Sequence, residues 1–137
     1  MEDYRLSRHF WLSEFTVSET ATRLGIDNTP SSEVLLNLAA TAMDMEVVRT
    51  ALDNHGIVPT SVFRCLELNR KLKSKDTSAH VQGYAVDFAC PSFGTPRQIW
   101  EHLTQFPVGH DQLILEFDRW VHISFDPRLR NQTFATG

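Results

Sequence analysis

The sequence predicts an α+β fold, in which N-terminal helices precede a small, mainly antiparallel sheet. Two observations support this prediction: patterns with helical spacing come first along the chain, and alternating strand patterns come later. The chain has 137 residues, of which 42% are hydrophobic and 22% are charged, as in an ordinary globular protein. This length is enough to bury one core, so we interpret residues 1–137 as a single domain.

The longest predicted helix covers about residues 33–54. Ser31 or Ser32 is the expected N-cap, and Gly56 is expected to end the helix. Apolar side chains recur along it at helical spacing, at Leu35, Leu38, Ala42, Met45, Val48 and Leu52. This stripe predicts the side of the helix that packs into the core.

Shorter elements are predicted on both sides of this helix. Before it, Ser18 is expected to cap a helix over residues 19–24, which Gly25 ends. After it we expect, in order, a strand over 57–63, a helix over 66–72, a strand over 84–89, a helix that begins at Thr95-Pro96 and runs to about 103, and strands over 111–117 and 120–125 joined by a turn at 118–119. Residues 126–137 are expected to form a polar, loosely packed tail.

The stretch from residue 78 to 87, Ser-Ala-His-Val-Gln-Gly-Tyr-Ala-Val-Asp, carries the first candidate site. In the predicted strand, Asp87 shares a face with two alanines, which leave room beside its carboxylate. Gly83 permits a turn that brings His80 and Asp87 toward one point. An imidazole nitrogen and a carboxylate oxygen are both zinc ligands. A surface histidine and an ordinary strand aspartate are the alternative, and a third ligand has to decide between them.

The last predicted hairpin offers that third ligand. Alternation over 120–125 places His122 on the face opposite the apolar side chains, and Glu116 on the preceding strand can reach the same side. His80, Asp87 and His122 then supply three ligands and leave the fourth position open, which describes a catalytic zinc site rather than a structural one. Glu116 is the predicted general base, which takes a proton from the attacking water.

In these residues the chain resembles the M15 family of zinc D-Ala-D-Ala carboxypeptidases and phage endolysins, in its small single-domain branch. Residues 78–87 satisfy every fixed position of the family signature Ser-x-His-x-x-Gly-x-Ala-x-Asp, and Trp120-Val121-His122 resembles the strand of the third ligand. Upstream, Ser61-Val62-Phe63-Arg64 resembles a Ser-x-x-Arg segment of the family, with Asn69 after it. The resemblance implies a zinc fold like that of hedgehog domains and D-Ala-D-Ala peptidases.

The chain departs from the family pattern at the general base. Several members place an acidic residue three positions before the last histidine, where this chain has Arg119. Glu116, six positions before His122, resembles the arrangement in hedgehog-type zinc domains. Asp118 is the alternative base, but its place in the predicted turn would expose it to water.

Three further residues are candidates for substrate binding. By resemblance, Arg64 holds a substrate carboxylate or a peptide carbonyl near the metal, and a guanidinium offers a planar fork for such a group. The alternative for Arg64 is an ordinary surface arginine after a strand. Ser78 and Gln82 are expected to orient His80 or to line the cleft.

The resemblance and the site together predict a zinc metallopeptidase that cleaves peptide bonds in bacterial peptidoglycan stem peptides. The alternative is a catalytically inactive zinc-containing domain that binds the cell wall or has a structural role. Which stem-peptide bond would be cut is left open, and so is the choice between carboxypeptidase and endopeptidase.

Composition argues against several other classes of protein. The 13 basic and 17 acidic residues give a net charge of -4, and the one small basic run, at residues 70–75, is expected to lie in a solvated loop, so we expect no nucleic-acid partner. No apolar run approaches the roughly 18 residues that span a bilayer, and no signal peptide is recognisable. We therefore expect a monomer that is cytoplasmic as synthesised and acts on the cell wall, as a phage-encoded lysis protein would. Cys65 and Cys90 are expected to be thiols, with a disulfide as the alternative.

Overall fold

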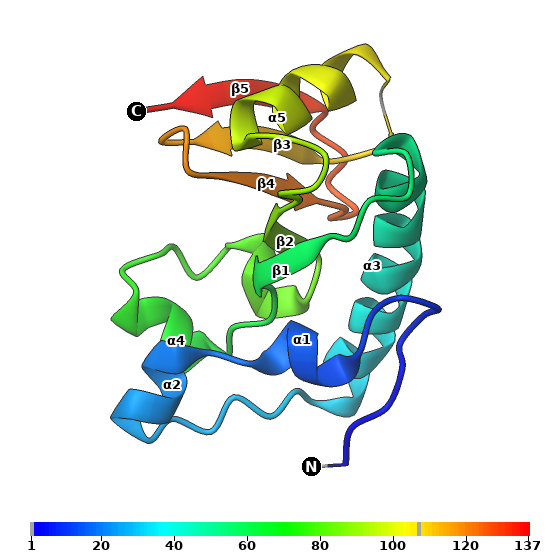
Figure 1. Ribbon diagram of the computed structural model, residues 1–137. Coiled ribbons are helices and arrows are strands. Elements are labelled where there is room, and N and C mark those ends of the chain that lie inside the picture. Colours follow the sequence, from blue (N-terminus) through cyan, green and yellow to red (C-terminus); the bar gives the residue numbers. More distant parts are fainter. Residues whose placement is uncertain (1, 107) are drawn as a thin grey trace.

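The computed structural model describes residues 2–106 and 108–137, and Figure 1 shows how their helices and strands are arranged. In chain order the elements are α1 (Leu12–Thr16), α2 (Glu19–Leu24), α3 (Ser32–Ala51), β1 (Val58–Ser61), α4 (Leu66–Lys71), the short 3-10 helix η1 (Ala79–Gln82), β2 (Ala85–Ala89), α5 (Pro96–Gln105), β3 (Gln112–Glu116), β4 (Trp120–Ser124) and β5 (Gln132–Thr136). The predicted α+β class is confirmed.

The sheet has the strand order β1-β2-β4-β3-β5. Every neighbouring pair is antiparallel except β3 and β5, which run parallel, so the sheet is mainly antiparallel as predicted. The register aligns Ser61, Asp87, His122 and Ile114 in one row across four strands. Because side chains alternate along a strand, this row and the rows two residues away share one face of the sheet.

The opposite face of the sheet packs onto the core. Val86, Phe88, Val121 and Ile123 are fully buried there, in one cluster with the buried side of α3. Figure 1 shows α3 lying along the sheet, while α1, α2 and α4 gather near β1 and α5 lies over β3 and β4. Most of the stripe predicted for α3 is fully buried, at Leu38, Ala42, Met45, Val48 and Leu52. Leu35 is partly buried. The predicted core stripe is therefore confirmed.

The end of α3 differs from the prediction. The helix begins after the N-cap Ser31, whose hydroxyl accepts a hydrogen bond from the Val34 amide, but it ends at Ala51 rather than at Asn54. Asp53 and Asn54 have φ angles of 56° and 60°. An L-residue in this left-handed region cannot continue a right-handed helix, so the stop comes before the glycine that was expected to provide it.

The first strand is also shorter than predicted. Residues 57–63 were expected to be extended, but β1 ends at Ser61. The next backbone groups leave the ladder for other partners: the Val62 carbonyl accepts a hydrogen bond from the His80 ring, and the Phe63 amide donates to the Phe15 carbonyl. The strand therefore ends where the backbone groups form hydrogen bonds to His80 and to α1 instead of to β2.

The C-terminal tail is ordered, contrary to the prediction of a loosely packed segment. Residues 132–136 form β5 and pair in parallel with β3, although all five are exposed. The buried carboxylate of Asp111 accepts hydrogen bonds from the Arg130 backbone amide at 2.6 Å and from its guanidinium at 2.7 Å, and the Asp111 carbonyl accepts one from the Gln132 amide. This latch aligns the tail with the sheet edge. Cys65 and Cys90 are free thiols, so the disulfide alternative is not realised. No helix within the described ranges is long and apolar enough to cross a bilayer.

Candidate metal centre and its surroundings

The structure brings the three predicted ligands together. His80 lies in η1, Asp87 in β2 and His122 in β4, directly opposite Asp87 in the sheet register. One ligand atom of each residue lies within 4.8 Å of the other two, and all three residues are buried. Oδ1 of Asp87 is 3.4 Å from Nε2 of His80 and 2.8 Å from Nδ1 of His122. Two ring nitrogens and one carboxylate oxygen therefore converge on one point.

The orientation of the His80 ring is fixed by a hydrogen bond on the ring nitrogen that does not face Asp87. Its Nδ1 lies 2.6 Å from the Val62 carbonyl oxygen, and a carbonyl can only accept, so Nδ1 carries the proton and donates it. Burial lowers the pKa of His80, and this effect outweighs the opposing charge of Asp87. The neutral ring then turns the lone pair of Nε2 toward the Asp87 carboxylate. Two lone pairs that face each other repel unless a proton or a cation lies between them, so this arrangement fits a cation.

Asp87 is held in its charged form. Burial by itself would raise the pKa of this carboxyl, but the contacts with His80 and His122 together hold it well below its usual range. The second oxygen of Asp87 contacts Nη2 of Arg64 at 3.4 Å. A buried His-Asp-His set with an ionised carboxylate is a donor set that zinc accepts.

Arg64 lies at the site and not on the open surface. Its Nε donates to the Ser61 hydroxyl at 3.2 Å, and Nη1 donates to the side chain of Asn69 at 3.4 Å. Its backbone amide also donates to the His80 carbonyl at 3.1 Å. Burial lowers the pKa of Arg64, and the charges of Asp87 and Glu116 oppose that change. These contacts place the largely buried Arg64 side chain beside the candidate ligands.

Glu116 is the acidic side chain that lies beside the three ligands. It ends β3, and its Oε1 is 3.9 Å from Nδ1 of His122. Burial and the charge of Asp87 raise the pKa of the Glu116 carboxyl. Asp118, the alternative base, is exposed and pairs with Arg97 of α5 at 3.1 Å.

The turn that separates these two acids lies one residue earlier than predicted. Phe117 and Asp118 both have positive φ angles, of 52° and 58°, as the central residues of a type I′ turn do. The Arg119 amide closes the turn with a hydrogen bond to the Glu116 carbonyl. The turn thus leaves Glu116 on the sheet face of His122 and directs Asp118 away from it.

Ser78 and Gln82 differ in their relation to the site. The Ser78 hydroxyl accepts a hydrogen bond from the His80 backbone amide at 3.3 Å and caps η1, so Ser78 helps to place the ligand as expected. Gln82 is exposed, and its backbone carbonyl, rather than its side chain, accepts a hydrogen bond from Asn37. After it, Gly83 takes a φ of 79° and lets the chain turn into β2.

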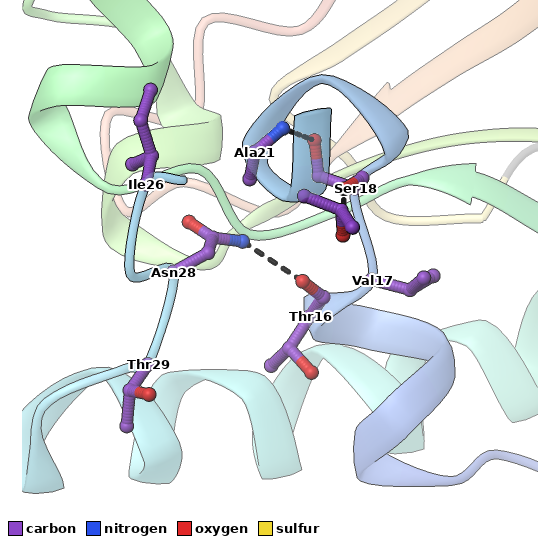
Figure 2. A pocket seen from close by; sticks show the side chains of 8 residues that line it. Thr16, Val17, Ser18, Ala21, Ile26, Asn28 and Thr29 are labelled. Carbon is purple, nitrogen blue, oxygen red and sulfur yellow. Dashed lines mark hydrogen bonds between the residues drawn. The ribbon is translucent and has the colours of Figure 1, made fainter. Parts of the chain in front are cut away.

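Asn28 was not predicted as a site residue, although it fixes the backbone on both sides of Arg64. Its side-chain amide donates to the carbonyls of Thr16 at 2.9 Å and Phe63 at 3.0 Å, and its Oδ1 accepts from the Cys65 amide at 2.8 Å. Figure 2 shows Asn28 in a pocket of about 210 Å³, with its amide directed at Thr16. None of the predicted site residues lines this pocket. All three partners are main-chain groups, so no side-chain motif could have indicated them.

Comparison with known proteins agrees with this geometry. The model of the family described as Peptidase M15 matches residues 8–124, which include the three candidate ligands and Glu116. No curated protein matches the chain.

Proposed function

The chain belongs to the Peptidase M15 family, and from this premise we propose that it is a zinc-dependent enzyme that cleaves peptide bonds in bacterial peptidoglycan stem peptides. The zinc in this proposal rests on the buried His-Asp-His set. The peptidoglycan substrate rests on the resemblance of residues 78–87 to the signature of D-Ala-D-Ala carboxypeptidases and phage endolysins. Family membership supports a peptidase, while the metal and the substrate are the proposed steps.

The observation that carries the proposal is the position of Glu116 beside the three ligands. His80, Asp87 and His122 would hold the zinc, which would supply a Lewis acid for a peptide carbonyl and for the attacking water. The Glu116 carboxylate, 3.9 Å from His122, accepts a proton from the attacking water and passes it to the leaving amine.

Arg64 stabilises charge on the substrate in this mechanism. Ser61, Asn69 and Asp87 each engage a different nitrogen of its guanidinium, so the group is held in one orientation before substrate arrives. The remaining hydrogens on Nη1 and Nη2 are available to a peptide carbonyl or carboxylate. A donor that is already aligned needs no reorganisation when negative charge develops on the carbonyl oxygen.

The test compares the two acids of the β3–β4 hairpin on purified peptidoglycan, with the fragments identified by mass spectrometry. Glu116→Gln keeps the shape of the side chain but cannot take a proton, so we expect turnover to fall by about 10²- to 10⁴-fold. Asp118→Asn is the matched control and should change turnover little. Zinc content should equal that of the wild type in both variants. A wild type that binds zinc but cleaves no wall substrate would instead support the inactive binding domain.

A further inference from the structure

A pocket rich in basic side chains adjoins the candidate metal centre. It has a volume of about 260 Å³, and its lining includes His122 and Ser78 on the side of the metal centre and Lys75, Arg128 and Arg130 on the other. We call it the basic pocket. No acidic side chain among the described residues lines it.

The two arginines are held in place while part of each guanidinium stays available. Nε and Nη2 of Arg130 bind the buried carboxylate of Asp111, and Nη2 of Arg128 contacts the Thr77 carbonyl at 3.1 Å and Asp126 at 2.9 Å. In residues 2–106 and 108–137, neither Nη1 has a hydrogen-bond partner. Anchored guanidinium groups with donors to spare match the geometry of a carboxylate.

A second pocket is lined in part by Arg64 and Ser61 and has a different character. It has a volume of about 250 Å³, and its lining includes Leu72, Phe63 and the acidic Glu19. The two linings differ: the basic pocket has Lys75 and two arginines that are each paired with an aspartate behind them, while the second pocket has one cation and one acid. A carboxylate is therefore favoured in the basic pocket, by Lys75 and by the Nη1 donors that the two arginines leave over.

On the premise of the proposed peptidase function, we propose that the basic pocket binds a carboxylate of the substrate peptide while the scissile bond lies at the metal centre. A volume of about 260 Å³ lies just below the roughly 300–1,000 Å³ of pockets that hold a whole ligand, which suits one residue of a peptide. The rest of the peptide lies across the ligands toward Arg64. The substrate class is thus an acidic peptide with its negative charge on the His122 side.

The carboxylate can come from two sources, which correspond to two kinds of cleavage. A C-terminal carboxylate in the basic pocket places the last peptide bond at the metal centre and makes the enzyme a carboxypeptidase. A carboxylate within the chain, such as that of the D-Glu residue of the stem, makes it an endopeptidase. Synthetic stem pentapeptides with either the C-terminus or the D-Glu carboxylate converted to an amide distinguish the two.

The experiment measures peptide binding separately from turnover. Calorimetric binding uses full-length zinc-loaded protein carrying Glu116→Gln, so that the peptide stays intact. Adding Lys75→Gln and Arg128→Gln should weaken binding of the unmodified pentapeptide about tenfold or more, the effect typical of lost hydrogen bonds to charged groups. Arg23→Gln, which removes an exposed charge on α2, is the matched control and should leave binding unchanged.

The amidated peptides decide whether the contact is to a carboxylate. Amidation of the carboxylate that occupies the basic pocket should weaken binding to the parent protein and abolish the difference between parent and pocket variants. Pocket variants that bind the unmodified peptide as tightly as the parent, or a parent that binds no peptide, would overturn this proposal. Failure of the peptidase proposal would give a different result: the wild-type protein would bind the pentapeptide without cleaving it.

Discussion

Val62 determines the chemistry of His80 without offering a side chain to it. Its carbonyl accepts a hydrogen bond from the protonated Nδ1, so Nε2 faces Asp87 with its lone pair. Contacts of this kind, in which a ligand histidine is oriented by a group behind it, normally tune the affinity of a metal site. At the scale of single residues, the site therefore depends on main-chain groups as much as on the ligands themselves.

Loss of any one ligand should remove the metal. We expect His80→Ala, Asp87→Ala and His122→Ala each to lose most of the bound zinc, because two ligands cannot hold the ion against water. Elemental analysis of purified protein checks this, with one zinc per chain expected for the wild type. His55→Ala, which changes a histidine that contacts Ser92, should retain full zinc content. A ligand variant with unchanged zinc would remove that residue from the centre.

The guanidinium of Arg64 should not be replaceable by an ammonium group. Each of its nitrogens has a different partner, and a lysine can occupy only one of those positions. We expect Arg64→Lys to lower kcat/KM about tenfold or more, with zinc content unchanged. Arg97→Lys, at an exposed arginine of α5, is the control. Equal kinetics of Arg64→Lys and wild type would contradict a role in substrate binding.

At the scale of elements, the segment between β1 and α4 has no regular secondary structure, but its backbone is held by several hydrogen bonds. Phe63 and Cys65 are tied to Asn28, and the amide of Arg64 between them is tied to the His80 carbonyl. A loop that carries a functional side chain is useful only if its backbone is fixed, because small displacements cost catalysis. Asn28 lies in the loop before α3 and provides that constraint, and its side chain is also hydrogen-bonded to Thr16 of α1.

Removal of the Asn28 side chain should affect both stability and turnover. Asn28→Ala leaves three main-chain groups without their partner, so we expect a loss of about 1–3 kcal/mol in the free energy of unfolding. Turnover should fall because Arg64 loses its fixed backbone, while zinc content should not change. Thr29→Ala, which removes only contacts to Asp27, is the neighbouring control. Full activity of a destabilised Asn28→Ala would limit Asn28 to a role in folding.

Local rules predicted the elements whose determinants lie within a few residues. Ser18 and Gly25 delimit α2 as expected, and alternation placed Asp87, His122 and Glu116 on one face of the sheet. The helix α1 and the strand β5 were not predicted. All five residues of β5 are exposed and show no apolar alternation, and the strand depends on a contact between Asp111 and Arg130, 19 positions apart. Asn28 was missed for the same reason, because its partners are up to 37 positions away.

For the whole molecule, the latch between Asp111 and Arg130 joins the tail to the sheet edge and also forms one wall of the basic pocket. Asp111 is fully buried, and Arg130 is part of the pocket lining. Burial raises the pKa of Asp111, but the hydrogen bonds and charge of Arg130 outweigh that effect and lower it. Stability and pocket geometry are therefore both linked to one ionised carboxylate.

The contribution of this latch should depend on pH in a defined direction. Because the folded-state pKa of Asp111 is lowered, the latch stabilises the fold above the unfolded value near 3.8 and loses its effect as pH falls through the folded value. We expect Asp111→Asn to lower the free energy of unfolding by about 1–3 kcal/mol at pH 7, and by less below about pH 4. Urea unfolding across this range checks the trend. Asp53→Asn, at an exposed left-handed position that asparagine also tolerates, should show no such trend.

His80 is bonded to the Arg64 segment twice, through its ring to Val62 and through its carbonyl to the Arg64 amide. Under the proposed function, the cation and the substrate would lie on the two sides of this hydrogen-bonded unit, and each would favour the same arrangement of it. Such linkage is reciprocal: whatever factor a bound peptide adds to the affinity for the cation, the cation adds to the affinity for the peptide. The protein should consequently lose its metal to a chelator more slowly with a peptide bound than alone.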